Sequence, residues 1–197
     1  MKRIILASHN TGKVTEFKQM LADYEVEVLS LVDVNYLEEI EETGTTFIEN
    51  ARIKAEAIAK MYPDAIVVAD DSGLAVNVLD GAPGVYSARY AGMDANADTN
   101  IDKLLSELNG VSTDNRNARF VCVLVVMYQN QEYVAQGTCE GQILTKRRGI
   151  GGFGYDPIFY LPQFNQTMAE LAKDEKNAIS HRGAAFKELL PILEGML

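Results

Sequence analysis

Hydrophobic positions recur along the chain at two different spacings, one typical of strands and one typical of helices. Short apolar runs and two-residue alternation predict strands over residues 3–7, 25–31, 65–69, 74–78, 120–128 and 132–144. Apolar residues three to four apart predict helices from about residue 14 to 21, over 45–61, over 96–108 and over 184–193. The first strands alternate with helices, whereas the last two long strands follow one another directly. The pattern therefore predicts a single α/β domain over residues 1–197 with a mixed sheet.

Composition and charge narrow the class of protein. With 47% hydrophobic and 23% charged residues, the chain has an ordinary globular composition. Its formal net charge of -10 disfavours binding to nucleic acid or to anionic membranes. Its longest apolar run, residues 120–127, is too short for a membrane helix. We therefore expect a soluble, cytoplasmic protein that binds neither nucleic acid nor membranes.

The metal-binding side chains indicate a hard cation if a metal is bound at all. Cys122 and Cys139 are too few for a disulfide framework and are expected to be free thiols. Together with His9 and His181 they do not form a zinc-binding pattern. Carboxylates are plentiful, so a metal here would be magnesium or manganese.

A polar loop, Ser8 to Lys13, separates the first predicted strand from the first predicted helix. The N-terminus of a helix presents unpaired N–H groups and the positive end of a dipole, so it favours an anion such as phosphate. Lys13 adds a cation in the first turn. The loop lacks the GxxxxGK[ST] pattern, and an ordinary capped turn is the alternative interpretation.

Carboxylates gather in two segments. The acidic stretch 38–42, taken alone, is typical of a solvated surface. Asp70 and Asp71 directly follow a Val-rich predicted strand, which places them at the carboxyl end of the sheet, where open α/β folds bind ligands. Adjacent carboxylates repel one another unless a cation or base chemistry compensates. The pair predicts a metal ligand or general base, and capping of the following turn is the alternative.

The segment 149–157 is rich in glycine and carries aromatic residues. Its glycines would let the backbone approach a flat ligand closely, while Phe153 and Tyr155 offer stacking faces and Asp156 offers an acceptor for a base or ribose edge. The alternative is a flexible hairpin tip.

The segment 176–182 concentrates cationic and titratable groups in an otherwise acidic chain. Lys176, His181 and Arg182 lie close together just before the last predicted helix. Such a cluster would suit a phosphate or a purine edge. The alternative is a set of ion pairs at the start of a helix.

Several of these segments together resemble the inosine triphosphate pyrophosphatase family, the non-canonical purine nucleoside triphosphate pyrophosphatases that cleanse nucleotide pools. In chain order they are SHNTGK, EETGTTFIENARIKA, ADDSGLAVNVLDGAPGVYSARYAG, GGFGYDPIF and EKNAISHRG. Their order and spacing resemble the family over essentially the whole chain. One local departure is Ser8-His9, where many relatives carry Thr-Gly.

The resemblance implies an α/β fold with a mixed, elongated, twisted sheet flanked by helices, and two lobes with an active-site cleft between them. It implies hydrolysis of ITP, dITP or XTP between the α and β phosphates, giving a nucleoside monophosphate and pyrophosphate, with Mg²⁺ as cofactor and a homodimer as assembly. Discrimination against adenine is expected to rest on the 6-keto group. Two alternatives stay open: a pyrophosphatase for other modified nucleotides, and a non-catalytic nucleotide-binding module.

The resemblance also implies roles for individual residues. Asp71 is implied as general base and magnesium ligand, with Lys13 stabilising charge on the phosphates. The acidic stretch is implied to supply a further ligand, for which Glu41 is favoured and Glu42 is the adjacent alternative. The residues implied to bind the nucleotide are Ser8, His9, Asn10, Thr11, Gly12, Lys13, Lys54, Ser72, Phe153, Gly154, Tyr155, Asp156, Lys176, His181 and Arg182, with Phe153 stacking on the base.

Overall fold

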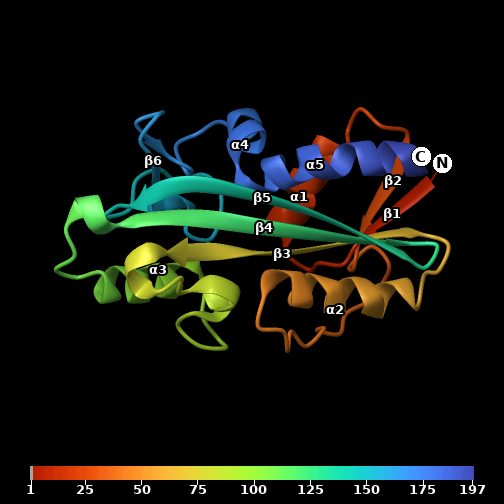
Figure 1. The fold of residues 1–197 in the computed structure, drawn as a ribbon, viewed down its shortest axis with the longest axis horizontal. Coiled ribbons are helices and arrows are strands. Elements are labelled where there is room, and N and C mark those ends of the chain that lie inside the picture. The colour runs from red at the N-terminus through yellow and green to blue at the C-terminus, as the bar shows by residue number, and fades with distance from the viewer. Residues whose placement is uncertain (1) are drawn as a thin grey trace. The chain divides into compact units, whose positions relative to one another are not determined.

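The computed structural model describes residues 2–197 and contains, over that range, a seven-stranded sheet with helices packed against it (Figure 1). The strand order is β2-β1-β3-β4-β5-β6-β7. The strands are β1 Lys2–Leu6, β2 Val26–Ser30, β3 Ile66–Val76, β4 Asn117–Tyr128, β5 Gln131–Ile143, β6 Phe159–Leu161 and β7 Gln166–Thr167. The helices are α1 Thr11–Met20, α2 Phe47–Ala59, α3 Ala97–Glu107, α4 Lys173–Ile179 and α5 His181–Met196, with short 3₁₀ turns at Asn77–Leu79, Gly84–Arg89, Thr113–Asn115 and Asp156–Ile158.

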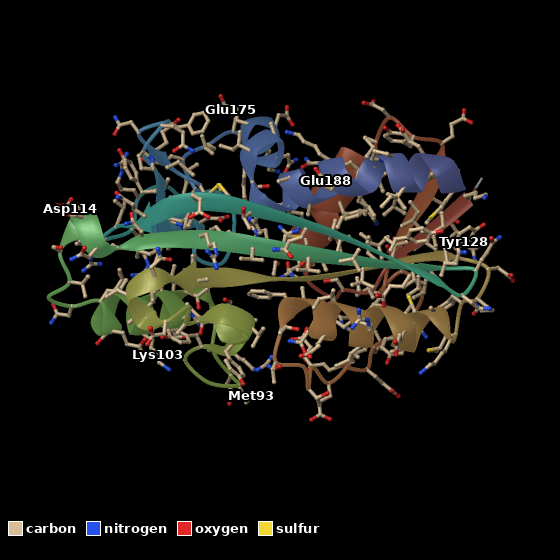
Figure 2. The ribbon with its side chains drawn as sticks, viewed as in Figure 1. Met93, Lys103, Asp114, Tyr128, Glu175 and Glu188 are labelled. Carbon is tan, nitrogen blue, oxygen red and sulfur yellow. The ribbon has the colours of Figure 1, made fainter. Side chains whose placement is uncertain are left out.

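Parallel and antiparallel pairing occupy different parts of the strand order. β1 pairs in parallel with both β2 and β3, whereas β6 pairs antiparallel with both β5 and β7. β4 and β5 are neighbours joined only by Gln129 and Asn130, which both have a positive φ, as in a tight hairpin. Tyr128 marks the end of β4 (Figure 2). The predicted mixed α/β sheet is therefore confirmed.

By the packing of its residues, the chain divides into two compact units. The described part of unit 1 comprises residues 2–71, 122–137 and 182–197, and unit 2 comprises residues 72–121 and 138–181. Each of the long strands β3, β4 and β5 therefore contributes residues to both units. Within residues 2–197, no helix has the length and hydropathy needed to span a bilayer.

Unit 1 is a layered structure in which helices cover both faces of the sheet. α1 and α5 lie on one face and α2 lies on the other (Figure 1). On the first face the rings of Phe17 and Phe186 meet edge to face, with centroids 5.4 Å apart. On the second, α2 buries Ala51, Ala55 and Ile58. Because successive strand residues point to opposite faces, neighbours along β3 contact different helices.

Unit 2 has a core of its own, made largely by α3 and by the segment around β6. Ile101, Leu104 and Leu108 come from α3 and its C-terminal end, and they belong to one buried cluster with Phe120 and Phe159. The rings of Phe120 and Phe159 have centroids 4.4 Å apart. These large side chains form a buried apolar cluster within unit 2.

Some element boundaries differ from the predictions made from sequence. β3 runs without a break through Asp70 to Gly73, so the predicted strands 65–69 and 74–78 are one strand. The residues there are turn formers by composition, but they continue a buried strand, so tertiary context overrides that local preference. α5 begins at His181 and continues past Pro191 to Met196. The seven-residue helix α4 was not predicted, since it is too short to show a helical period.

Candidate active site

Asp70 and Asp71 lie inside β3, just past the point where its parallel partner β1 ends. β1 pairs with β3 as far as Leu6 and Val68. The two carboxylates are therefore at the carboxyl end of β1, as expected for a ligand site, although β3 itself does not end there. Side-chain alternation sends Asp70 toward residues of α1 and α5 and sends Asp71 toward α2.

Both carboxylate oxygens of Asp70 are paired in the interior of unit 1. Lys13 Nζ lies 2.5 Å from Oδ1, and Arg182 Nε lies 2.7 Å from Oδ2. The Cys122 thiol lies 3.3 Å from the same Oδ2. Burial alone would raise the pKa of Asp70, but the charges of Arg182 and Lys13 outweigh it and hold that pKa well below its usual range. Asp70 is thus favoured as an anion and pairs with the Lys13 ammonium.

Arg182 connects α5 to β3 and α1 from a fully buried position. Its side chain is 1% exposed, and its Nη1 lies 2.5 Å from Glu16 Oε2. With Asp70 on its other side, the guanidinium holds two buried carboxylates at once. Its predicted role in nucleotide binding stays a prediction, and the guanidinium contacts two protein carboxylates.

Two residues of this network, Glu16 and Cys122, were missed by sequence reasoning. Glu16 follows Lys13 by three positions, so the two residues share a face of α1. That spacing was the available signal. The sequence offered no comparable signal for Cys122, because a cysteine in a Val-rich strand resembles any small apolar residue.

On the α2 side, Lys54 is shared among several oxygens. Its Nζ lies 2.5 Å from Glu42 Oε1, 2.9 Å from the carbonyl oxygen of Asp70 and 3.3 Å from Asp71 Oδ1. Burial lowers the pKa of Lys54, but the charges of Asp71 and Glu42 outweigh burial, so the net effect is a raised pKa. Lys54 is a largely buried cation that pairs with both Glu42 and Asp71.

One carboxylate oxygen of Asp71, Oδ1, contacts Lys54, and the other, Oδ2, has no partner among the described residues. Its Oδ2 is buried and accepts no hydrogen bond from any group within residues 2–197. Burial raises the pKa of Asp71 above its ordinary value, and the charges of Lys54 and Lys13 oppose that rise in part. A buried carboxylate oxygen without a partner is an atom at which a cation or a water molecule would be expected.

The acidic stretch contacts Lys54 through Glu42. The Glu42 side chain is 22% exposed and reaches Lys54, whereas Glu41 is exposed. Glu42 therefore joins Asp71 around the same ammonium group. Glu42 rather than Glu41 thus contacts Lys54, and which of the two glutamates binds a metal stays a prediction. The stretch forms no helix or strand, so only its tertiary contacts determine which glutamate turns inward.

The loop before α1 is a capped helix start that also leaves amides available. Asn10 is the N-cap: its Oδ1 accepts from the backbone N–H of Lys13 at 3.1 Å, and Ser8 Oγ accepts from the N–H of Asn10 at 3.1 Å. The first amides of a helix, here those of Thr11 and Gly12, have no intrahelical acceptor. The capped turn and the anion site are therefore compatible interpretations of the same loop.

His9 contacts the segment that follows β2. Its Nε2 lies 2.8 Å from the carbonyl oxygen of Tyr36, and the two rings are stacked with centroids 6.4 Å apart. This contact anchors the loop 8–10 to the start of the long segment that carries the acidic stretch.

Unit 2 contains a second buried ion pair, next to the glycine-rich loop. Lys176 Nζ lies 2.8 Å from Asp156 Oδ2 and 4.6 Å from the centroid of the Phe153 ring. The backbone N–H of Phe153 donates to the same Oδ2 at 2.8 Å. Gly152 has a φ of 71°, and a Cβ at this position would lie 2.1 Å from Asp156 Oδ2. Asp156 thus holds the loop in a definite conformation that requires glycine at 152.

The remaining predicted nucleotide contacts lie in or beside the core of unit 2. Tyr155 is 5% exposed and its hydroxyl donates to the carbonyl oxygen of Ser87 at 2.8 Å. His181 is 6% exposed and stacks on Phe120 with ring centroids 4.7 Å apart. The partly exposed members of the predicted set in this unit are Ser72, Phe153 and Gly154.

With this geometry in hand, comparison with known proteins decides the family. The model of the Ham1 family matches residues 4–192. The chain belongs to the Ham1 family. Its curated relatives in this family include the dITP/XTP pyrophosphatase of Bacillus subtilis, 52% identical over 195 residues that cover 98% of each chain. The dITP/XTP pyrophosphatase of Bacillus licheniformis is 53% identical and covers 98% of this chain and 99% of its own. The resemblance inferred from motifs is confirmed.

Solved Ham1 structures have the same fold over the whole chain. The Staphylococcus aureus Ham1 protein superposes with a TM-score of 0.87 at 44% identity and covers 100% of both chains. A HAM1 protein from Coxiella burnetii gives a TM-score of 0.88 at 43% identity, covering 99% of this chain and 100% of its own. The Ham1 fold therefore extends over both units.

Proposed function

We propose that this Ham1-family protein hydrolyses non-canonical purine nucleoside triphosphates (ITP, dITP and XTP) to the nucleoside monophosphate and pyrophosphate. Relatives named dITP/XTP pyrophosphatase, 52% identical over 98% of the chain, supply the substrate class. The observation that carries the proposal is Asp71, a buried carboxylate with one unpartnered oxygen beside the Lys54 ammonium. Hydrolysis of a phosphoanhydride needs such a base, together with cations for the phosphate oxygens.

Magnesium fits the donor set of unit 1. Mg²⁺ is usually bound by one or two carboxylates, with substrate phosphates and water completing the octahedron. Asp71, through its unpartnered Oδ2, and Glu42 would form such a pair. Among residues 2–197 no larger group of His, Cys, Asp or Glu is arranged to hold a metal. When bound, magnesium supplies charge neutralisation for the triphosphate and lowers the pKa of bound water.

The protein's own groups divide the chemical work in unit 1. Asp71 accepts the proton of the attacking water, and burial suits it to this role because a raised pKa makes its carboxylate a stronger base. Lys13 and Lys54 stabilise charge that develops on the phosphates. Asp70 stays ionised and serves to hold Lys13.

The start of α1 is proposed to bind the triphosphate. The amides of Thr11 and Gly12 and the ammonium of Lys13 meet at the N-terminal end of this helix, where the helix dipole also favours an anion. Asn10 keeps the first turn in place through its cap.

The glycine-rich loop of unit 2 is proposed to bind the base. Phe153 is partly exposed and is held by Asp156, so its ring can stack on a purine. Selection against adenine would rest on a donor aimed at the 6-keto group, because adenine's amino group leaves such a donor unpaired.

The test is pyrophosphate release across a nucleotide panel containing ITP, dITP, XTP, ATP, GTP and a modified pyrimidine triphosphate, with and without magnesium. We expect magnesium-dependent release from the three non-canonical purines. Turnover restricted to other nucleotides would indicate a pyrophosphatase of different specificity. Tight nucleotide binding without turnover would indicate a non-catalytic module. We also propose that the protein is a cytoplasmic homodimer, which sedimentation of the purified chain and fractionation of cells would check.

A further inference from the structure

Helices α2 and α3 begin in the same way. Each opens with a capping box, formed by Thr46 and Glu49 in α2 and by Asn96 and Thr99 in α3. In each, the fourth residue of the helix is a buried asparagine, Asn50 in α2 and Asn100 in α3. Each asparagine uses its Oδ1 to accept a backbone N–H of the preceding loop, from Gly44 at 2.8 Å and from Ala91 at 2.7 Å.

The two asparagines differ in their second polar atom. Asn100 Nδ2 donates to the carbonyl oxygen of Ala88 at 3.0 Å, so the whole amide is satisfied. Asn50 is 0% exposed, yet its Nδ2 has no acceptor within residues 2–197. A buried donor without a partner costs about 1–3 kcal/mol. The start of α2 therefore leaves one buried donor unsatisfied, whereas the start of α3 leaves none on its asparagine.

The Oδ1 atom of Asn50 holds the backbone just after the acidic stretch, at Gly44. Gly44 lies against the first turn of α2, where a Cβ on it would meet Glu49 Cβ at 2.6 Å and Asn50 Oδ1 at 2.7 Å. Two residues before Gly44 stands Glu42, which pairs with Lys54 at 2.5 Å. Lys54 is one helical turn beyond Asn50, so the two residues share a face of α2. Residues 42–44, at the end of the acidic stretch, are thus attached to one face of α2 at two points, Gly44 and Glu42.

These contacts make the position of the Glu42 carboxylate depend on Asn50. The segment between β2 and α2 contains no helix or strand, so no ladder of backbone hydrogen bonds holds it in place. An aspartate at position 50 would accept the Gly44 amide but would bury a charge, and an apolar residue would leave that amide unpaired. Asparagine is the side chain of this size that accepts the bond without a charge.

We propose that Asn50 is a positioning residue for the metal site: by holding Gly44, it fixes the Glu42 carboxylate beside Asp71 and thereby sets the affinity of the protein for its divalent cation. The inference rests on the proposed function for the identity of the cation site. Asn50 is not itself proposed as a metal ligand, because its Oδ1 accepts the Gly44 N–H and its Nδ2 is a donor, which does not bind a cation.

The experiment measures Mn²⁺ binding to the nucleotide-free protein by electron paramagnetic resonance, alongside the Mg²⁺ concentration that gives half-maximal pyrophosphate release. Asn50→Leu removes the acceptor at nearly constant shape, and Gly44→Ala disturbs the same contact from the loop side. Both variants should weaken Mn²⁺ binding and raise the half-saturating Mg²⁺ by roughly tenfold, as loss of an outer-shell partner does. At saturating Mg²⁺ the kcat should stay within a few-fold of the parent. Asn50→Asp, which keeps the acceptor, should bind Mn²⁺ more tightly than Asn50→Leu.

Asn100→Leu is the matched control, at the same helix position in unit 2, where Lys103 marks α3 in Figure 2. It should lower the thermal midpoint, since it leaves two backbone groups unpaired, without changing Mn²⁺ binding. The proposal is overturned if Asn50→Leu and Gly44→Ala lower the midpoint as Asn100→Leu does while Mn²⁺ affinity stays at the parent value. It also falls if neither variant folds or if the parent binds no Mn²⁺. If the parent binds Mn²⁺ but hydrolyses no purine triphosphate, the proposed function fails and Mn²⁺ binding alone decides the role of Asn50.

Discussion

The two units of this protein bury charge in different ways. In unit 2, Asp156 and Lys176 form a closed pair: both side chains are less than a tenth exposed, and the ammonium also lies over the Phe153 ring. In unit 1, the cluster around Asp71 is incomplete, because Oδ2 has no partner and Lys54 is shared among several oxygens. A closed pair fixes local geometry. An incomplete buried cluster costs free energy and is expected where a ligand completes it.

The same contrast exists within unit 1. Asp70 stands next to Asp71 in β3, yet both its oxygens are paired, and Arg182 and Glu16 complete its surroundings. Adjacent aspartates on opposite faces of one strand therefore have different roles: Asp70 orients its neighbours, and Asp71 is available for chemistry.

Asp71→Asn and Asp156→Asn should separate chemistry from positioning most clearly. We expect Asp71→Asn to lower turnover by roughly 10²- to 10⁴-fold, the range attributed to a general base. Its thermal midpoint should not fall, since burial already disfavours that charge. Asp156→Asn should lower the midpoint, because it leaves Lys176 buried without its counter-charge. Steady-state kinetics and thermal melts of both variants provide the check, and activity of Asp71→Asn within a few-fold of the parent would refute the assignment.

Arg182→Leu should be strongly destabilising. Removing one partner of a buried ionic network typically costs about 3–5 kcal/mol, and here both Asp70 and Glu16 would lose their cation. Arg116 in unit 2 is the matched control: it is 4% exposed and donates to the carbonyl oxygens of Leu108, Val111 and Leu144.

Arg116→Leu leaves no buried carboxylate behind, so its effect should be smaller. Urea unfolding at neutral pH compares the two variants. An equal or larger loss of unfolding free energy for Arg116→Leu would contradict the view that Arg182 acts as a charge-neutralising link.

Phe153→Ala should reduce kcat/KM for ITP by about one to two orders of magnitude, since stacking on a base is worth roughly 1–3 kcal/mol. The loss should be shared by all purines, because every base has a flat face, so the ratio of ITP to ATP hydrolysis should change much less. Phe153→Leu, which keeps apolar bulk but no ring, is the control and should also lose activity. Unchanged ITP kinetics in Phe153→Ala would assign the ring to local packing against Lys176.

Asp33→Asn tests an exposed charge of unit 1 and should have the smallest effect. The backbone N–H of Ser30, followed by the Lys18 ammonium, lowers the pKa of Asp33 from 3.8 to about 2. A pKa lowered by folding stabilises the folded state above the unfolded pKa, and the contribution is lost as pH falls through the folded pKa. The parent should therefore melt slightly above Asp33→Asn at pH 7, and the difference should shrink between about pH 4 and pH 2. A difference that grows on acidification would contradict the sign.

Much of the fold could be predicted from the sequence because its elements are locally encoded. α2 and α3 show apolar residues at helical spacing behind a capping residue, and β4 is a long apolar run. The predictions failed where tertiary contacts overrode local preference. The turn-forming residues Asp70 to Gly73 lie in mid-strand, where the surroundings of the long strand β3 outweigh their local preference. Prediction missed α4 because seven residues are too few to establish a period.

By itself, the sequence determined the mixed α/β class, the Ham1 motifs and the residue types that carry the chemistry, since these depend on local periodicity and on side-chain identity. The tertiary structure alone decided how those residues are used. Strand alternation gave Asp70 and Asp71 different surroundings, and an irregular segment turned Glu42 rather than Glu41 toward Lys54. Arg182 became a buried link between carboxylates and Tyr155 a core residue. These roles depend on which distant segments pack together. A side chain's burial and its ion-pair partners are set by that packing and cannot be read from one stretch of sequence.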